Sequence, residues 1–193
     1  APAKAAGDGR LALRPEAPGR VHVVAAPLAQ ASARSRAWVD RSGLKVEKVG
    51  SLEVRFPDGE GWRIERTGDN ADWKLGGGVP PGQKLDTSRA NAASYMLSQL
   101  EVADVATPEL AKKPADTGLD KPTLVSATTL EGKPYEIRVG KLLGEDHFLS
   151  FSTPTPDARE KVLMQHVLLV PKSKLEDTLK KRGELLEKQD TKK

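Results

Sequence analysis

The chain has 193 residues, enough to bury a hydrophobic core in one domain, or in one domain plus part of another. It contains no cysteine, which excludes disulfides, thiolate catalysis and cysteine metal sites. The net charge is only +4, and acidic and basic residues alternate without the clusters of Lys, Arg and aromatic residues typical of nucleic-acid binding. We therefore expect no nucleic-acid partner. No stretch approaches the roughly 20 apolar residues of a membrane span.

The first segment predicts a hairpin followed by a helix. "RLALR" (10–14) and "RVHVVAAP" (20–27) have strand-like composition, and "PEAPG" between them is a turn signal. A helical pattern follows Pro27, and Gly43 is a suitable helix stop. Because the chain opens with the small residues "APAKAAGDG", we interpret it as a processed or excised piece of a longer polypeptide.

A meander of three short strands is predicted next, within residues 44–56, 62–66 and 72–75. Their connections are too short for a parallel crossover, so the strands should pair antiparallel. The glycine-rich loop "GGGVPPGQ" (76–83) lacks the Gly-Lys-Ser/Thr of a phosphate-binding loop, and its two prolines remove N–H donors. It is predicted to be a connector.

The clearest helix should begin after Asp86. Asp86 is a good N-cap, and Leu85 before it can staple the first turn. Apolar side chains then recur at helical spacing and predict a core-facing stripe. The stripe comprises Ala93, Met96, Leu97 and Leu100.

The second half predicts more strands. A connector with three prolines (106–122) precedes a hairpin formed by "TLVSATTL" and "YEIRV", and "HFLSFS" forms another strand. "TPTPDAREK" is expected to loop out, and "QHVLLVP" to return as a strand. Ser173 and Glu176 form a capping-box pattern for a last helix carrying Leu175 and Leu179. The basic end of the chain should be frayed.

Two similar hexapeptides, "HVVAAP" (22–27) and "HVLLVP" (166–171), suggest a repeated element. Each follows a Gly-acidic pair and a strand, so we expect residues 7–42 to superpose on 144–183 as strand–strand–helix. Residues 1–43 would be the C-terminal half of a preceding module, packed on the rest, because a hairpin and one helix bury too little surface alone. Residues 44–193 would be one complete module. The predicted class is α+β, with antiparallel meander and hairpin strands and a few packed helices.

The order of these motifs resembles the bacterial domain-of-unknown-function 4340 family. The resemblance rests on "WKL" (73–75), the helix from Asp86, "TGLDKP" (117–122), "EGKPYEIRVGK" and "HFLSFS", and it spans about residues 38–180. Members often carry the pattern in tandem. They usually have an N-terminal membrane anchor, absent from this chain, and extracytoplasmic domains. Some are encoded with gliding-motility-type ABC transporter components.

The resemblance therefore implies a non-enzymatic extracytoplasmic accessory or binding module of a bacterial envelope transport or motility complex. Its partners would be ABC transporter or other envelope protein subunits, and it would reach the membrane only through the anchor. The resemblance brings no catalytic residues and no cofactor. Two alternatives stay open: a hydrolase acting on envelope material, and a purely structural module.

The residues themselves supply no catalytic, cofactor or metal site. His22, His147 and His166 are the only histidines, and they lack additional ligands at zinc-site spacing. No Gly-x-Ser-x-Gly elbow supports a nucleophile, and paired acid–base carboxylates require a cleft that a sequence cannot show. Trp38 and Trp73 could be binding aromatics, but their positions favour the core.

We predict that the protein binds no stoichiometric transition metal at neutral pH, because His22 and His166 occupy equivalent places in different modules. Elemental analysis of protein purified without chelator is the measurement. A tightly held zinc ion that is lost when any one of the three histidines is replaced by Ala would contradict this prediction.

Overall fold

The computed structural model describes residues 10–14, 16–24, 41 and 43–187. The chain divides into two compact units, Ala1–Trp38 and Val39–Lys193. In the first unit, β1 (Arg10–Arg14) and β2 (Ala17–Val24) form an antiparallel hairpin, as predicted. The helix expected after Pro27 lies outside the described residues.

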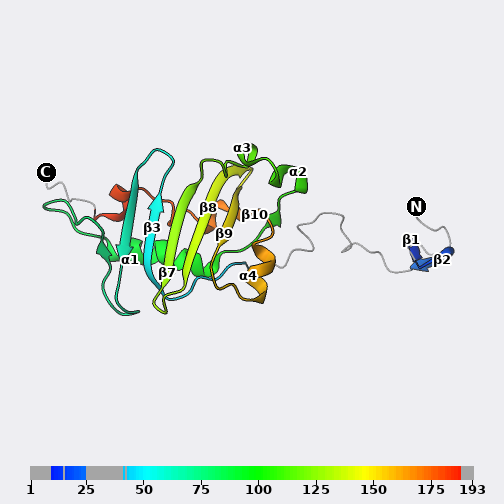
Figure 1. Ribbon diagram of the computed structural model, residues 1–193, viewed down its shortest axis with the longest axis horizontal. Helices are drawn as coiled ribbons and strands as arrows, with labels where there is room; N and C mark the ends of the chain where they lie inside the picture. Colours follow the sequence, from blue (N-terminus) through cyan, green and yellow to red (C-terminus); the bar gives the residue numbers. More distant parts are fainter. Residues whose placement is uncertain (1–9, 15, 25–40, 42, 188–193) are drawn as a thin grey trace. The chain divides into compact units, whose positions relative to one another are not determined.

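The second unit is built on one eight-stranded sheet with the order β5-β4-β3-β7-β8-β9-β10-β6 (Figure 1). Every neighbouring pair is antiparallel, which confirms the α+β class. The strands are β3 (Val49–Arg55), β4 (Gly61–Glu65), β5 (Lys74–Leu75), β6 (Asp104–Val105), β7 (Thr123–Thr129), β8 (Pro134–Leu143), β9 (Asp146–Ser152) and β10 (Leu168–Pro171). The predicted meander and the hairpin of β7 and β8 are therefore present.

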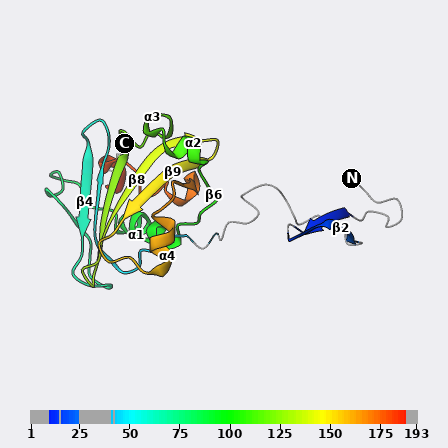
Figure 2. The ribbon, with the colours of Figure 1, turned by 45° about the vertical axis from the view of Figure 1, so that its right-hand side comes forward.

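Apolar and polar side chains alternate along the strands, so one face of the sheet is buried and the other is exposed. The buried face carries the apolar members of each strand, including Leu52, Ile64, Val125, Ile137 and Leu149, all fully buried. Figures 1 and 2 show α1 (Thr87–Tyr95) lying across one face of the sheet. Ala90 and Ala93 of α1, with Leu97 after it, belong to the same core as the strand residues.

The helix α1 begins where the sequence places it. The Asp86 side chain accepts a hydrogen bond from the Arg89 backbone N–H at 3.1 Å, as an N-cap should. After Tyr95 the helix tightens into the 3₁₀ helix η2 (Met96–Gln99). Of the predicted stripe, Ala93, Leu97 and Leu100 are buried.

Three short helices lie in segments that the sequence predicts as loops. They are α2 (Pro108–Ala111), α3 (Pro114–Thr117) and α4 (Ala158–Leu163). The α4 helix has a full capping box, in which Asp157 and Glu160 bond reciprocally to each other's backbone N–H. The signal was present in "PDARE", but the surrounding prolines masked it.

The predicted C-terminal helix is wrong. The segment forms the 3₁₀ helix η3 (Lys172–Lys174), then turns, then the 3₁₀ helix η4 (Arg182–Leu185). Its backbone carbonyls bond to other parts of the chain instead of to an α-helical ladder: the Trp62 indole N–H donates to the Lys180 carbonyl at 2.6 Å. Leu175 and Leu185 are fully buried, so tertiary packing decides the local conformation.

The repeat remains a prediction. β9 and β10 pair antiparallel, as β1 and β2 do, but α4 lies between them, and from β10 to the last described residue, 187, there is no α-helix. The strand β10 begins at Leu168, so His166 precedes it, whereas His22 lies inside β2. The assignment of residues 1–43 to a preceding module is likewise still a prediction.

The "TGLDKP" motif makes a close backbone contact with β8. Gly118 ends α3 in the left-handed region, with φ at 73°, and Thr117 before it is fully buried. A Cβ placed on Gly140 of β8 would lie 2.2 Å from the Thr117 carbonyl oxygen. Only glycine fits there, which explains the spacing between the motif and the glycine in "RVGK".

We therefore expect Gly140→Ala to destabilise the fold by about 2 kcal/mol or more, because the added methyl group must push α3 away from the sheet. Urea denaturation is the measurement. Gly68→Ala is the control, since a Cβ there meets nothing within 4 Å, and it should stay within about 0.5 kcal/mol of the parent. Equal stability of the two variants would contradict this account.

Candidate binding cleft

A cleft of about 1080 Å³ lies beside α1 and η2 in the second unit. Its walls are the α1–η2 face on one side and the extended segment 43–49 on the other, with the turn after β4 contributing Arg66 and Asp69. The volume lies slightly above the usual range for ligand pockets, about 300–1,000 Å³. This cleft is the candidate functional site.

The helical wall carries a stripe of polar side chains. Ser88, Asn91, Tyr95 and Gln99 follow one another at steps of three and four residues, and all four are exposed. Tyr95 is 60% exposed, and its hydroxyl accepts a hydrogen bond from the Gln99 side-chain amide at 2.7 Å. The bond fixes the direction of an aromatic ring that core packing does not hold.

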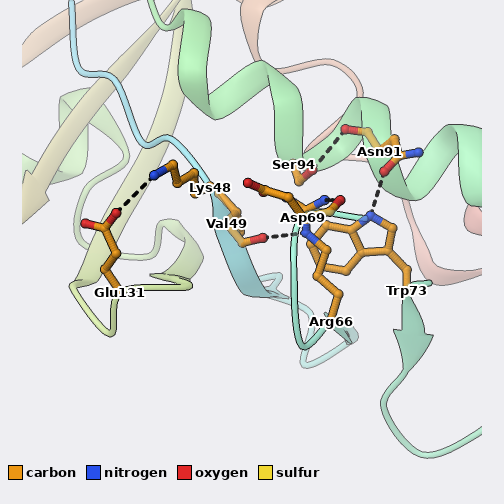
Figure 3. Close-up of polar contacts among 8 residues, drawn as sticks. All are labelled: Lys48, Val49, Arg66, Asp69, Trp73, Asn91, Ser94 and Glu131. Atoms are coloured by element: carbon orange, nitrogen blue, oxygen red, sulfur yellow. Dashed lines mark hydrogen bonds and ion pairs between the residues drawn. The ribbon is translucent and has the colours of Figure 1, made fainter. Parts of the chain in front are cut away.

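The floor of the cleft includes Arg66 and Asn91, and both contact the core residue Trp73, which does not itself line the cleft (Figure 3). The Arg66 side chain is 13% exposed, and its guanidinium carbon lies 4.7 Å from the centre of the Trp73 ring. Arg66 donates to the Val49 carbonyl at 2.8 Å and to Asp69. The Trp73 indole N–H donates to the Asn91 side-chain oxygen at 2.8 Å, which ties the floor to α1.

The second wall is held by backbone hydrogen bonds at Val46 and Lys48. The Val46 N–H donates to the Leu97 carbonyl at 3.0 Å, which ties the segment to η2. Lys48 adopts a left-handed conformation, with φ at 50°, which for a non-glycine residue costs about 1 kcal/mol. Its carbonyl accepts from the Leu130 N–H at 2.7 Å, and its ammonium group lies 3.2 Å from Glu131. The neighbouring hairpin therefore holds the bend at the mouth of the cleft.

The charges around the cleft balance. Three basic residues (Lys45, Lys48, Arg66) and three acidic residues (Glu47, Asp69, Glu101) line it. Glu101 accepts a hydrogen bond from Lys174 at 2.9 Å, and this bond together with the lysine's charge holds the pKa of Glu101 below its usual value. Glu101 is therefore ionised at neutral pH.

A second cluster, the buried Glu160 and Tyr135 with the partly exposed Lys133, lies outside the cleft. Glu160 accepts from the Lys133 ammonium group at 2.7 Å and from the Tyr135 hydroxyl at 2.7 Å. Burial works to raise the pKa of Glu160, but hydrogen bonds from Lys133, the Asp157 N–H and Tyr135 outweigh it and lower the pKa. Burial raises the pKa of Tyr135. The cluster fastens α4 to β8 and leaves Glu160 ionised.

The histidines lie in three different settings. His22 is exposed on β2, and His166 is exposed in the turn between α4 and β10, outside the apolar strand predicted for it. His147 on β9 is half-buried, with Nδ1 3.0 Å from the Gly140 carbonyl oxygen. Among the residues with described positions, no group of three or more His, Cys, Asp or Glu side chains is arranged to hold a metal ion.

Trp73 and the glycine-rich loop both have structural roles. Trp73 is 6% exposed and belongs to the core, as expected, while Trp38 lies outside the described residues. In the loop 76–83, the carbonyls of Gly76 and Gly78 accept hydrogen bonds from Arg182, at 3.2 and 2.7 Å. The loop therefore binds the Arg182 guanidinium through its carbonyl oxygens. It connects β5 to α1, as predicted.

Sequence reasoning missed the cleft because it considered only one side of the helix. The apolar stripe from Ala93 to Leu100 was recognised as core, but the polar stripe on the opposite side was not considered. Its signal was the helical spacing of Ser88, Asn91, Tyr95 and Gln99. The segment 43–49 gave no signal of its own, because only the folded chain brings it against η2.

The fold is an α+β domain with one antiparallel sheet and a polar cleft. The family model DUF4340, a domain of unknown function, matches residues 2–122, more than half of the chain, and the chain belongs to this family. The match begins and ends earlier than the span 38–180 inferred from motifs, and it stops at the end of "TGLDKP". The motifs in β8 and β9 therefore lie beyond it. No curated protein and no solved structure matches this chain.

No described helix has the length and apolar character required to cross a bilayer.

The Glu160 cluster generates a prediction of pH-dependent stability. Because the folded pKa of Glu160 is lowered, its stabilisation is fully present above the unfolded pKa of about 4.3 and is lost as the pH falls through the folded pKa. Glu160→Gln should cost about 1.5 kcal/mol at pH 7, since Lys133 loses its ionised partner but is 27% exposed and remains partly solvated. The cost should shrink in acid, as measured by urea denaturation across pH.

Glu131→Gln is the matched control for Glu160→Gln. Glu131 pairs with Lys48 in solvent, with side chains 74% and 57% exposed, so its loss should cost at most about 0.5 kcal/mol. A cost for Glu160→Gln that stays constant from neutral pH to strong acid would show that the carboxylate charge is not the source of the stabilisation.

Proposed function

We propose that this chain is a non-enzymatic binding module of an extracytoplasmic accessory protein in a bacterial envelope transport or motility complex. Membership of the DUF4340 family and the resemblance to envelope accessory proteins support the location and the accessory role. The cleft beside α1 supports the binding role. Its partners in the complex would be ABC transporter or other envelope subunits.

The observation that carries the binding role is the locked floor of the cleft. Arg66, Trp73 and Asn91 hold one another through stacking and hydrogen bonds, and Gln99 holds the exposed Tyr95. A site whose side chains are fixed before binding loses little side-chain entropy when the ligand arrives. A module with a purely structural role gains nothing from an exposed aromatic ring beside a cleft, so Tyr95 favours binding over that alternative.

The hydrolase alternative requires a carboxylic acid that keeps its proton near neutral pH. The hydrogen bond from Lys174 lowers the pKa of Glu101, and Asp69 pairs with Arg66 at 3.2 Å. The contact with Lys174 stabilises Glu101 in the ionised form. The cleft is therefore better suited to holding a ligand than to transferring protons.

We expect the full-length protein, tagged and purified from mildly solubilised membranes of its own cells, to recover ABC transporter ATPase and permease subunits. The matched control is an unrelated exported protein with the same tag, which should recover neither. Protease added to intact spheroplasts should digest the protein, as an extracytoplasmic location requires.

Two results would overturn this proposal. Recovery of no transporter or motility subunit would remove the accessory role. Release of soluble fragments from purified envelope material by the isolated protein, in amounts that rise with protein concentration, would replace binding with hydrolysis.

A further inference from the structure

We infer that the cleft binds a neutral, hydroxyl-rich ligand, a short glycan, with a sugar ring stacked on Tyr95 and its hydroxyl groups bonded to the polar stripe of α1 and η2. This inference rests on the proposed binding function and adds the chemical class of the ligand.

Tyr95 is exceptional among the aromatic side chains of the second unit. Trp62, Trp73 and Tyr135 are 3%, 6% and 6% exposed, whereas Tyr95 is 60% exposed. Leaving a large apolar ring in water forfeits about 1.5–3 kcal/mol that burial would supply. The ring is nevertheless held by Gln99 at one side of a cleft. An oriented ring with a free face suits the apolar C–H face of a sugar, which packs on the electron-rich face of the ring.

The groups around Tyr95 suit hydroxyl partners. Ser88, Asn91 and Gln99 are exposed in the cleft wall, and each side chain can both donate and accept hydrogen bonds. A sugar hydroxyl is also both a donor and an acceptor, so either direction of bonding is available. Such uncharged groups fix the orientation of a ligand without selecting its charge.

The electrostatics of the cleft disfavour a charged ligand. Arg66 is bonded to Asp69, Lys48 to Glu131 and Glu101 to Lys174. Lys45 and Glu47 add one charge of each sign. An anion site uses converging cationic side chains whose donors point at the ligand. A cation site needs converging carboxylates or carbonyl oxygens instead. The lining has neither an excess of positive charge nor an excess of negative charge.

A peptide ligand would require apolar anchor pockets. Protein partners gain most of their binding energy from a few apolar or aromatic side chains buried in well-packed pockets. The large aliphatic residues of the lining, Val46, Val49 and Leu100, are 1%, 3% and 2% exposed, so the core already covers them. The cleft offers an incoming side chain polar atoms and one aromatic ring, which favours the sugar.

The test uses tetra-N-acetylchitotetraose (chitotetraose) as the neutral probe, titrated into the purified chain by isothermal calorimetry. Two charged probes of similar length accompany it: the deacetylated, cationic tetramer and the anionic tetragalacturonate. We expect binding of chitotetraose in the range of about 0.1–1 mM, and at least about tenfold weaker binding of both charged probes.

The variants isolate the ring of Tyr95. Tyr95→Ala should weaken chitotetraose binding by about tenfold or more, equivalent to about 1.4 kcal/mol, while Tyr95→Phe, which keeps the ring but loses the hydroxyl that Gln99 bonds, should weaken it by no more than about threefold. Val162→Ala removes an equally exposed apolar side chain on α4 and should change nothing. Because Tyr95 is exposed, the urea midpoint of Tyr95→Ala should match that of the parent, so that a loss of binding is not a loss of fold.

Three outcomes would overturn the inference: no chitotetraose binding up to about 10 mM, equal binding by Tyr95→Ala, or tighter, salt-sensitive binding of a charged probe. Recovery of transporter subunits by the full-length protein separates this failure from failure of the proposed function. If the parent recovers those subunits but the cleft binds no glycan, the accessory role stands and only the ligand class is wrong.

Discussion

The packing of α1 on the sheet is the contact on which the rest of the second unit depends. Its inner face presents Ala90 and Ala93, both fully buried, and these small side chains let the helix approach the strands closely. The outer face is then free to carry long polar side chains. The same nine-residue helix therefore closes the core on one side and forms the wall of the cleft on the other.

Arg66 and Trp73 connect these two roles. Trp73 is a core residue, but its indole N–H reaches the Asn91 side chain on α1 and its ring supports the Arg66 guanidinium. Arg66 in turn donates a hydrogen bond to the carbonyl of Val49, the first residue of β3. A partly buried polar network of this kind is most stable when its members are satisfied, which requires the helix, the start of β3 and the turn after β4 at one geometry. The cleft floor is rigid because the core would lose hydrogen bonds if it moved.

The sequence predicted the parts of the fold that local patterns control. Alternation located β3, β4, β7, β8 and β9, and Asp86 located the start of α1. The errors occurred where distant contacts decide the conformation. Ser173 and Glu176 match a helix start, yet the segment forms 3₁₀ turns because its leucines must enter the core. The cleft could not be predicted for the same reason, because no local pattern shows that the Val46 N–H donates to the Leu97 carbonyl.

The C-terminal segment shows how far the helical wall depends on distant residues. The Asp86 N–H donates to the Leu185 carbonyl at 2.8 Å, and Arg89 of α1 donates to the Glu184 and Leu186 carbonyls. Hydrogen bonds from a charged donor contribute about 1.5–3 kcal/mol each, so they hold the first turn of α1 firmly. These carbonyls belong to η4 and to Leu186, the residue after it, outside the 2–122 segment that matches the family. The family segment contains both walls of the cleft, but the position of its helical wall is set by residues that follow the segment in the chain.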